Sequence, residues 1–186
     1  MDNELIAVIS IVEDPLGEKV KELWQTFENQ YNTKGVQIFK YPSVTLAGGS
    51  ISPDKLKILK ENFQRFGTKV KPWILSVEKY DHVEQDSIYM KVERQQEILA
   101  VNILVNSFLE IFCDELIEDY KPENFRPHIA LAMNDLEDEQ FDRAWKVYAA
   151  EKCNYQQQIN NIILVKFEED GHLEMIARAK LGEKEG

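Results

Sequence analysis

The sequence has only two cysteines among its 186 residues, and it lacks the common motifs of metal and cofactor sites. Cys113 and Cys153 are too few for a disulfide framework, and no metal-ligand spacing surrounds either of them. Cys113 lies in an apolar helical pattern, which favours a small core residue over a nucleophile. A glycine-rich phosphate loop, a GxGxxG motif and an HExxH motif are all missing. The sequence therefore predicts no metal and no cofactor.

Long apolar runs are also missing. Residues 98–112 form the richest apolar stretch, but four polar residues interrupt it, and a membrane helix needs about 20 apolar residues. Residues 1–4 lack the basic start and the small-residue cleavage site of a signal peptide. We therefore expect a cytoplasmic protein with no membrane partner.

Basic residues are outnumbered, because 22 Lys and Arg stand against 33 Asp and Glu, a net charge of −11. This balance argues against a long nucleic-acid duplex as partner, since such binding neutralises many phosphates. A small phosphate ligand stays compatible with it. Residues 93–186 carry most of the negative charge, whereas residues 54–79 have a basic surplus. That surplus fits a solvated surface more simply than a phosphate-steering patch.

Apolar residues make up 44% of the sequence, which is enough for a buried core in one α+β domain. The segment 95–118 is apolar around most of a helix circumference, so it is expected to be buried on most sides at the centre of the fold. Gly48-Gly49 is expected to end a strand. The polar tail 181–186 is expected to fray. Periodicity predicts strands over 5–12, 36–47, 73–80, 87–93, 126–132, 162–168 and 173–179, and further helices over 16–31, 52–66 and 134–148.

The two halves of the chain repeat one order of elements: strand, helix and strand pair. Residues 42–47, PSVTLA, align with residues 127–132, PHIALA, and share proline, leucine and alanine at matching positions. Residues 73–75 and 162–164 continue the match after a small shift. The shared order favours an ancient duplication over chance similarity between buried strands.

This repeat predicts one bilobal domain over residues 1–186. Lobe 1 is expected at about 1–93, lobe 2 at about 94–180 and the tail at 181–186. The lobes are expected to face each other across a pseudo-twofold axis.

Side chains two residues apart in a strand project from the same face. Ser43 and Thr45 therefore share one face of the first repeated strand, and His128 and Ala130 share the matching face of the second. Facing lobes would bring these side chains to one cleft, which is the candidate site. For His128, the alternative is a structural role as a histidine buried on a strand with a backbone partner.

The doubled pattern of proline followed by His-x-Thr/Ser and a hydrophobic residue resembles the 2H phosphoesterase superfamily, which contains the 2′-5′ RNA ligases and cyclic phosphodiesterases. The resemblance implies a duplicated α/β fold with two antiparallel sheets around a central groove. It also implies metal-independent chemistry on 2′,3′-cyclic or 2′-5′ phosphodiesters. The expected partner is then a small nucleotide or an RNA-end phosphodiester, and a monomer is expected.

The resemblance assigns His128 as a proton-transfer residue, and Thr45 with Ser43 as hydrogen-bond donors to phosphate oxygens. Imidazole suits proton transfer because it titrates near neutral pH. The sequence departs from the pattern, since Ser43 stands where the first histidine belongs and Ala130 where the second hydroxyl belongs. Loss of one proton-transfer partner typically lowers a rate about 10²–10⁴-fold.

Two functions therefore stay open: a divergent phosphodiesterase, and a catalytically inactive groove-binding or regulatory protein. A third, a scaffold whose acidic second half contacts a basic partner, rests on charge asymmetry alone.

Other residues are candidates for contacts with a substrate. Tyr41 and Arg126 directly precede the two repeated prolines and could stack on a base or contact a phosphate. Arg178 lies on the last expected strand and could line a positive groove wall. Each fits an exposed strand position equally well. His82 and His172 lie in or beside expected hairpin loops, where a surface role is simpler.

Overall fold

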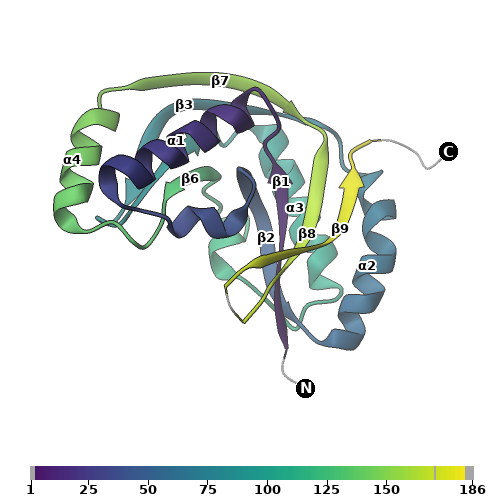
Figure 1. Ribbon diagram of the computed structural model, residues 1–186. Helices are drawn as coiled ribbons and strands as arrows, with labels where there is room; N and C mark the ends of the chain where they lie inside the picture. The colour runs from purple at the N-terminus through teal and green to yellow at the C-terminus, as the bar shows by residue number, and fades with distance from the viewer. Residues whose placement is uncertain (1–2, 170, 183–186) are drawn as a thin grey trace.

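The structure is a computed structural model that describes residues 3–169 and 171–182. Within these residues the chain forms two antiparallel sheets and four α-helices. Figure 1 shows that the sheets belong to two limbs of the molecule, which meet at an angle. None of the helices in the described ranges is long and apolar enough to cross a membrane.

Sheet A has five strands in the order β5-β2-β1-β8-β9. Every neighbouring pair is antiparallel. β1 lies at the centre of this sheet. Its sequence, ELIAVISI, is mostly apolar, and six successive residues of it are buried. The bounds are β1 Glu4–Ile11, β2 Ser43–Ile51, β5 Glu115–Leu116, β8 Asn161–Phe167 and β9 Leu173–Lys180.

Sheet B has four strands in the order β6-β4-β3-β7, again with antiparallel neighbours. β3 and β4 form the hairpin that the sequence predicts. The bounds are β3 Trp73–Val83, β4 Ser87–Val92, β6 His128–Ala132 and β7 Lys152–Ile159.

The two sheets have equivalent strand orders, because β2-β1-β8-β9 corresponds to β6-β4-β3-β7. The repeated segments of the sequence, residues 42–47 and 127–132, reach β2 and β6, which hold equivalent places. Residues 73–75 and 162–164 likewise belong to the equivalent strands β3 and β8. Each sheet nevertheless takes strands from both halves of the chain. A boundary near residue 93 therefore does not coincide with the division into sheets.

Four helices cover the sheets. α1 (Leu16–Tyr31) packs against β6 and α4 (Asp138–Tyr148), whereas α2 (Pro53–Gly67) packs against β8 and β9. α3 (Gln96–Glu110) packs against β2 and β3. α2 approaches β9 closely at Gly67, where an added Cβ would lie 2.5 Å from the Cβ of Ala179.

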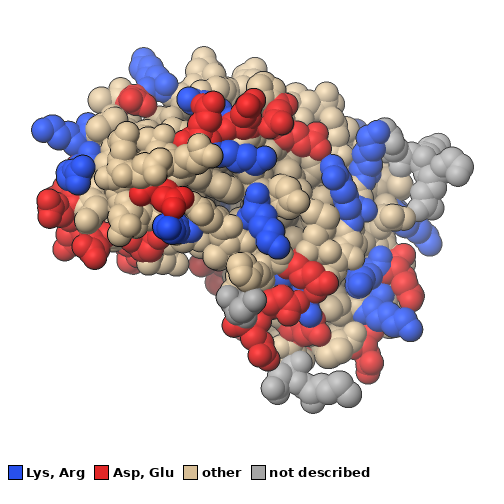
Figure 2. All heavy atoms as spheres, viewed as in Figure 1, with Lys and Arg blue, Asp and Glu red and all other residues tan. Residues whose placement is uncertain are grey.

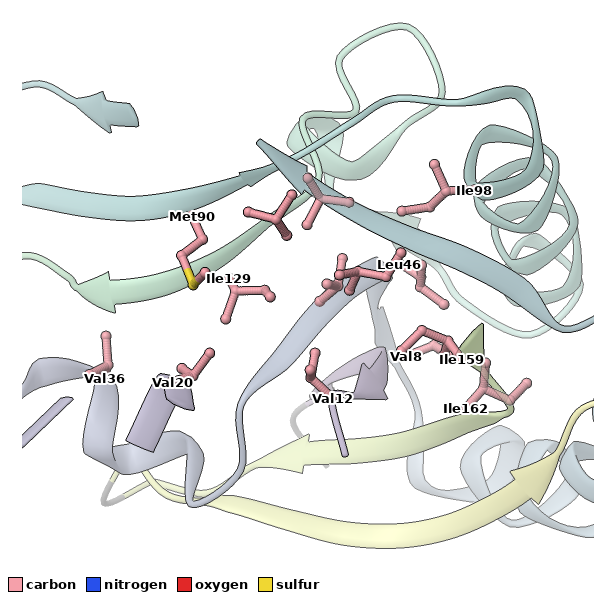
Figure 3. Packing of buried hydrophobic residues seen from close by; sticks show 14 of the residues in the cluster. Val8, Val12, Val20, Val36, Leu46, Met90, Ile98, Ile129, Ile159 and Ile162 are labelled. Carbon is pink, nitrogen blue, oxygen red and sulfur yellow. The ribbon is translucent and has the colours of Figure 1, made fainter. Parts of the chain in front are cut away.

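One apolar core joins the two sheets. Leu46 of β2 and Ile129 of β6 are both fully buried in it, and Figure 3 shows them together with Met90 of β4 and Ile98 of α3. Because Leu46 and Ile129 point inward, Thr45, His128 and Ala130 project from the opposite faces of their strands. The core therefore sets which side chains face the candidate site.

The strand expected over 36–47 is wrong in its first part and too short at its end. Residues Gly35–Phe39 form a 3-10 helix, η1, and β2 continues through Gly48 and Gly49. At Gly49 an added Cβ would lie 2.7 Å from the carbonyl oxygen of Glu115. The glycine therefore permits the close approach of β5 and does not end the strand.

Three further expectations need correction. α3 ends at Glu110 and is not buried on most sides, because Ile103 and Leu104 are each 45% exposed. β7 has no counterpart among the expected strands, since most of its residues are polar and half of them are exposed. Leu181 does not fray, because it is buried and its N–H donates to the carbonyl of Asn160. The rest of the expected tail, 183–186, lies outside the described residues.

Candidate functional site

The two motif strands meet at a small cavity of about 50 Å³. β2 and β6 belong to different sheets but contact each other. This contact brings all four predicted motif positions, 43, 45, 128 and 130, to one place, as the sequence predicts. The lining residues are Trp24, Phe39, Tyr41, Ser43, Thr45, Tyr120, His128, Ala130 and Met133.

His128 has a defined orientation in this cavity. Its Nδ1 lies 2.8 Å from the carbonyl oxygen of Arg126. Because a carbonyl only accepts hydrogen bonds, Nδ1 carries the hydrogen, and the neutral ring is left with Nε2 as an acceptor. The ring of Tyr89 packs beside the imidazole, with centroids 4.9 Å apart. Burial lowers the pKa of His128, and the carbonyl of Arg126 opposes this in part. The side chain is therefore neutral at pH 7 and able to accept a proton.

Tyr120 is a site residue that the sequence did not reveal. It ends the short 3-10 helix η2 (Glu118–Tyr120), between the expected helix 95–118 and the expected strand 126–132, where the sequence assigns no site residue. Its side chain lines the cavity together with Thr45, whose hydroxyl is near enough to oppose in part the rise in the pKa of the phenol. Burial raises the pKa of Tyr120, so the phenol keeps its proton at neutral pH. No periodic signal marks such a residue, because only the tertiary fold brings it to β2.

Two buried asparagines of α3 fix the position of Tyr120. Asn102 Nδ2 donates to the Tyr120 carbonyl at 2.8 Å, and Asn106 Nδ2 donates to the same oxygen at 3.0 Å. Asn102 Nδ2 also donates to the carbonyl of Leu46, the neighbour of Thr45 on β2, at 2.7 Å. The main chains beside Thr45 and at Tyr120 are therefore tied to one helix.

A larger pocket of about 670 Å³ opens on the other side of His128 and Tyr120, which line both spaces. Its charged side chains are balanced, since Arg94 and Arg126 stand with Asp119 and Glu123. Its volume lies within the range of about 300–1,000 Å³ that is typical of small-ligand sites. The remaining lining residues are Val83, Tyr89, Asn124 and Phe125.

Aromatic side chains, one of them from η1, line one part of the small cavity. Trp24 of α1 donates its indole N–H to the carbonyl of Ala130 at 2.9 Å. Phe39, at the end of η1, lines the cavity and packs against both core clusters. The carboxylate of Asp135 accepts hydrogen bonds from the N–H groups of Lys34 and Gly35, at 2.6 and 2.7 Å. One carboxylate therefore anchors the start of η1, which carries Phe39 to the cavity.

Of the three residues predicted to contact a substrate, two line one of the two spaces and one lines neither. Tyr41 lines the small cavity and is 45% exposed, and Arg126 lines the larger pocket. Arg178 lines neither space, and its Nη2 pairs with Glu13 at 3.1 Å.

The two remaining histidines also lie outside both spaces. His82 lies on β3 and packs against the rings of Phe141 and Trp145. His172 is exposed in the turn between β8 and β9. Among residues 3–169 and 171–182, no three His, Cys, Asp or Glu side chains are grouped to hold a metal ion.

The chain resembles solved structures along nearly its whole length, at low sequence identity. Escherichia coli LigT in its apo form matches with a TM-score of 0.63 at 12% identity, over 98% of this chain and 100% of the other. TT0787 of Thermus thermophilus matches with a TM-score of 0.63 at 13% identity, over 97% and 100% of the two chains. A structure described as a phosphoesterase matches with a TM-score of 0.61 at 14% identity, over 98% and 100%.

No protein-family profile and no curated protein matches the sequence. The structural likeness shows the fold: the chain has the two-sheet α+β fold of the LigT-like 2H phosphoesterases. The predicted fold class is confirmed.

Proposed function

We propose that the protein acts on the phosphodiester of a small nucleotide or of an RNA end, without a metal ion, and that His128 is a proton-transfer residue. The observation that carries the proposal is the convergence of His128, Thr45, Ser43 and Tyr120 on one cavity at the junction of two equivalent sheets. Cleavage of a phosphodiester needs one group to take a proton from the attacking oxygen. His128 suits that task because its Nε2 is an acceptor and its pKa is lowered by burial.

Two hydroxyls supply hydrogen bonds for the phosphoryl group. Thr45 and Ser43 project from the same face of β2 into the cavity. Hydroxyl donors aimed at nonbridging oxygens stabilise the charge that these oxygens hold during transfer. Arg126, in the larger pocket beside His128, adds a positive charge for a phosphate on that side.

A small ligand suits the charge of the molecule better than a long duplex does. The net charge is −11, and on the face drawn in Figure 2 acidic and basic side chains are interspersed. Duplex binding favours a continuous basic surface, because affinity comes from many neutralised phosphates. E. coli LigT, which has this fold, has been solved in complexes with phosphate and with 3′-AMP. A nucleotide of that size is the ligand that we propose.

The test is turnover of 2′,3′-cyclic nucleotides and of short 2′-5′ oligonucleotides by the pure protein, with and without a chelator. We expect turnover that His128→Ala lowers about 10²–10⁴-fold and that the chelator leaves unchanged. Thr45→Val is expected to weaken binding of 3′-AMP. His172→Ala is the matched control, because this histidine is exposed and lies outside both spaces. Absence of both turnover and nucleotide binding would refute the proposal.

A second candidate function is a nucleotide receptor without catalysis. It is favoured by Ser43 and Ala130, which stand where the resemblance implies a histidine and a hydroxyl. Binding of 3′-AMP that is weakened by Thr45→Val, together with no turnover of either substrate class, would establish the receptor and exclude the enzyme.

A further inference from the structure

The site has one imidazole, yet phosphodiester cleavage needs two proton transfers. One group accepts a proton from the attacking oxygen, and another donates a proton to the departing oxygen. Ser43 cannot serve as the second group, because a serine hydroxyl is a weak acid and base unless another group activates it.

We propose that the Tyr120 hydroxyl is this second proton-transfer group and takes the place of the imidazole missing at position 43. The inference rests on the proposed phosphodiester chemistry. Tyr120 and His128 both line the small cavity and the larger pocket, so a phosphodiester at their junction meets both side chains. η2 contacts β2, and the Tyr120 side chain lies with Thr45 at the small cavity.

The surroundings of Tyr120 are built to hold it in place. Asn102 and Asn106 are buried in α3, and each donates its side-chain amide to the Tyr120 carbonyl. Neither side-chain oxygen of these asparagines has a hydrogen-bond partner. An unsatisfied buried oxygen costs free energy, about 1–3 kcal/mol in typical proteins. The fold therefore keeps two asparagines here despite the cost of their unpartnered oxygens, and their amides hold the main chain of Tyr120.

The two other tyrosines near His128 suit the role less well. Tyr41 is largely exposed at the rim of the small cavity. Tyr89 packs its ring against the imidazole, and the charges nearest its hydroxyl are those of Asp81 and Arg126. Neither contacts Thr45 in the way that Tyr120 does.

The protonation states of the pair are complementary. Burial lowers the pKa of His128 and raises the pKa of Tyr120. At neutral pH the imidazole is therefore neutral and can accept a proton, and the phenol is protonated and can donate one. These are the two roles, proton acceptor and proton donor, that a pair of histidines would otherwise fill.

Hydrolysis of a 2′,3′-cyclic phosphodiester then balances with water as the co-reactant. His128 Nε2 takes a proton from water while the water oxygen forms a bond to phosphorus. The bond from phosphorus to the ribose oxygen breaks, its electron pair stays on that oxygen, and the oxygen takes the hydroxyl proton of Tyr120. The proton on His128 returns to the Tyr120 phenolate through solvent, which restores both groups and leaves a phosphomonoester.

A leaving-group comparison tests this role. The wild-type protein and Tyr120→Phe are assayed with 2′,3′-cyclic AMP, whose departing ribose oxygen needs a proton, and with bis(p-nitrophenyl) phosphate, whose departing phenolate does not. We expect Tyr120→Phe to lower kcat about 10²–10⁴-fold for the cyclic nucleotide and less than about tenfold for the nitrophenyl ester. Tyr155→Phe is the matched control, since this tyrosine lies on β7 and lines neither space.

A second measurement guards against a folding defect in the variant. Fluorotyrosine at position 120 keeps the hydroxyl and its contacts but makes it a stronger acid. The alkaline limb of the kcat profile is then expected to move to lower pH. An alkaline limb that stays in place would overturn the role of Tyr120.

The remaining outcomes separate this inference from the proposed function. Equal losses for both substrates, or no loss for either, would overturn the role of Tyr120 while phosphodiester turnover stands. Binding of 3′-AMP without turnover would overturn the role of Tyr120 and leave the receptor function. Absence of binding and turnover together would remove the proposed function itself.

Discussion

The side-chain amide of Asn102 donates to the carbonyl oxygen of Leu46, with 2.7 Å between nitrogen and oxygen. The same nitrogen donates to the carbonyl of Tyr120 at 2.8 Å. One fully buried side chain of α3 therefore holds both the strand that carries Thr45 and the segment that carries Tyr120. The relative positions of the two hydroxyls depend on this amide.

Asn102→Leu is expected to destabilise the protein strongly. The leucine side chain is of similar size but donates no hydrogen bond. The Leu46 carbonyl loses this donor, at a cost of about 1–3 kcal/mol, whereas the Tyr120 carbonyl keeps Asn106 as a donor. Denaturant unfolding measures the change in free energy. Asn29→Leu, at an exposed position of α1, is the control and should change it by no more than about 0.5 kcal/mol. Equal stabilities of the two variants would show that Asn102 does not anchor this region.

The pH dependence of turnover should follow the titration of His128. Burial lowers its pKa from the ordinary value of about 6.5, and only the neutral ring accepts a proton. We therefore expect kcat/KM to rise with pH through a midpoint below about 6.5 and then to level off. A profile of kcat/KM against pH, together with an NMR titration of the imidazole, measures both midpoints. An acidic limb centred above 6.5 would contradict this assignment.

The same shift predicts a loss of stability in acid. Because the native imidazole binds a proton less readily than the unfolded one, the unfolded state binds more protons in the pH range below about 6.5. The His128 contribution to the unfolding free energy is complete above that pH and is lost as pH falls toward the lower native pKa. Unfolding experiments between neutral and acid pH should show a component that is missing in His128→Gln. An identical pH dependence of the two proteins would argue against the shift.

Restoring the residues that the resemblance implies should raise activity. The double variant Ser43→His, Ala130→Thr places a second imidazole and a second hydroxyl on strands that already reach the cavity. We expect kcat for 2′,3′-cyclic AMP to rise by at most about 10²-fold, because an imidazole transfers protons near neutral pH more readily than a phenol whose pKa is raised by burial. Ser43→Asn, Ala130→Thr is the control, because the amide does not transfer protons. Similar rates for the two variants would show that the added imidazole does not reach the phosphoryl group.

The two candidate arginines should differ in their effect on ligand binding. Arg126 lines the larger pocket next to His128, whereas Arg178 is paired with Glu13 outside it. Arg126→Gln is expected to weaken 3′-AMP binding about tenfold, which corresponds to about 1.4 kcal/mol. Arg178→Gln should leave the affinity unchanged. Calorimetric titrations of both variants at two salt concentrations would measure this, and equal effects would contradict the assignment.

Local patterns carried much of the fold. Alternation in residues 43–47 and 128–132 correctly predicted which side chains are buried and which face the site, because strand geometry depends on neighbouring residues alone. The 3-10 helix at residues 35–39 was missed for the opposite reason. Its first amides bind the carboxylate of Asp135, which lies 100 residues further along the chain.

The site residues likewise divide into those that local sequence predicted and those that it did not. Ser43, Thr45 and His128 were predicted from the repeat, and the structure brings them together. Tyr120 was not predicted, because it lies in an irregular segment and is held by side chains of α3. Arg178 was predicted from its position on a strand face, which does not reveal that Glu13 is beside it.

Three properties follow from the sequence alone: the order of most helices and strands, the inward and outward faces of the two motif strands, and the departure of Ser43 from the motif that the resemblance implies. These properties depend on residues close together in the chain. The tertiary packing, in contrast, establishes which strands share a sheet. It also brings Tyr120 and Thr45 to one cavity with His128. Those relationships join residues far apart in the chain, and they exist only once a common core has packed the two sheets together.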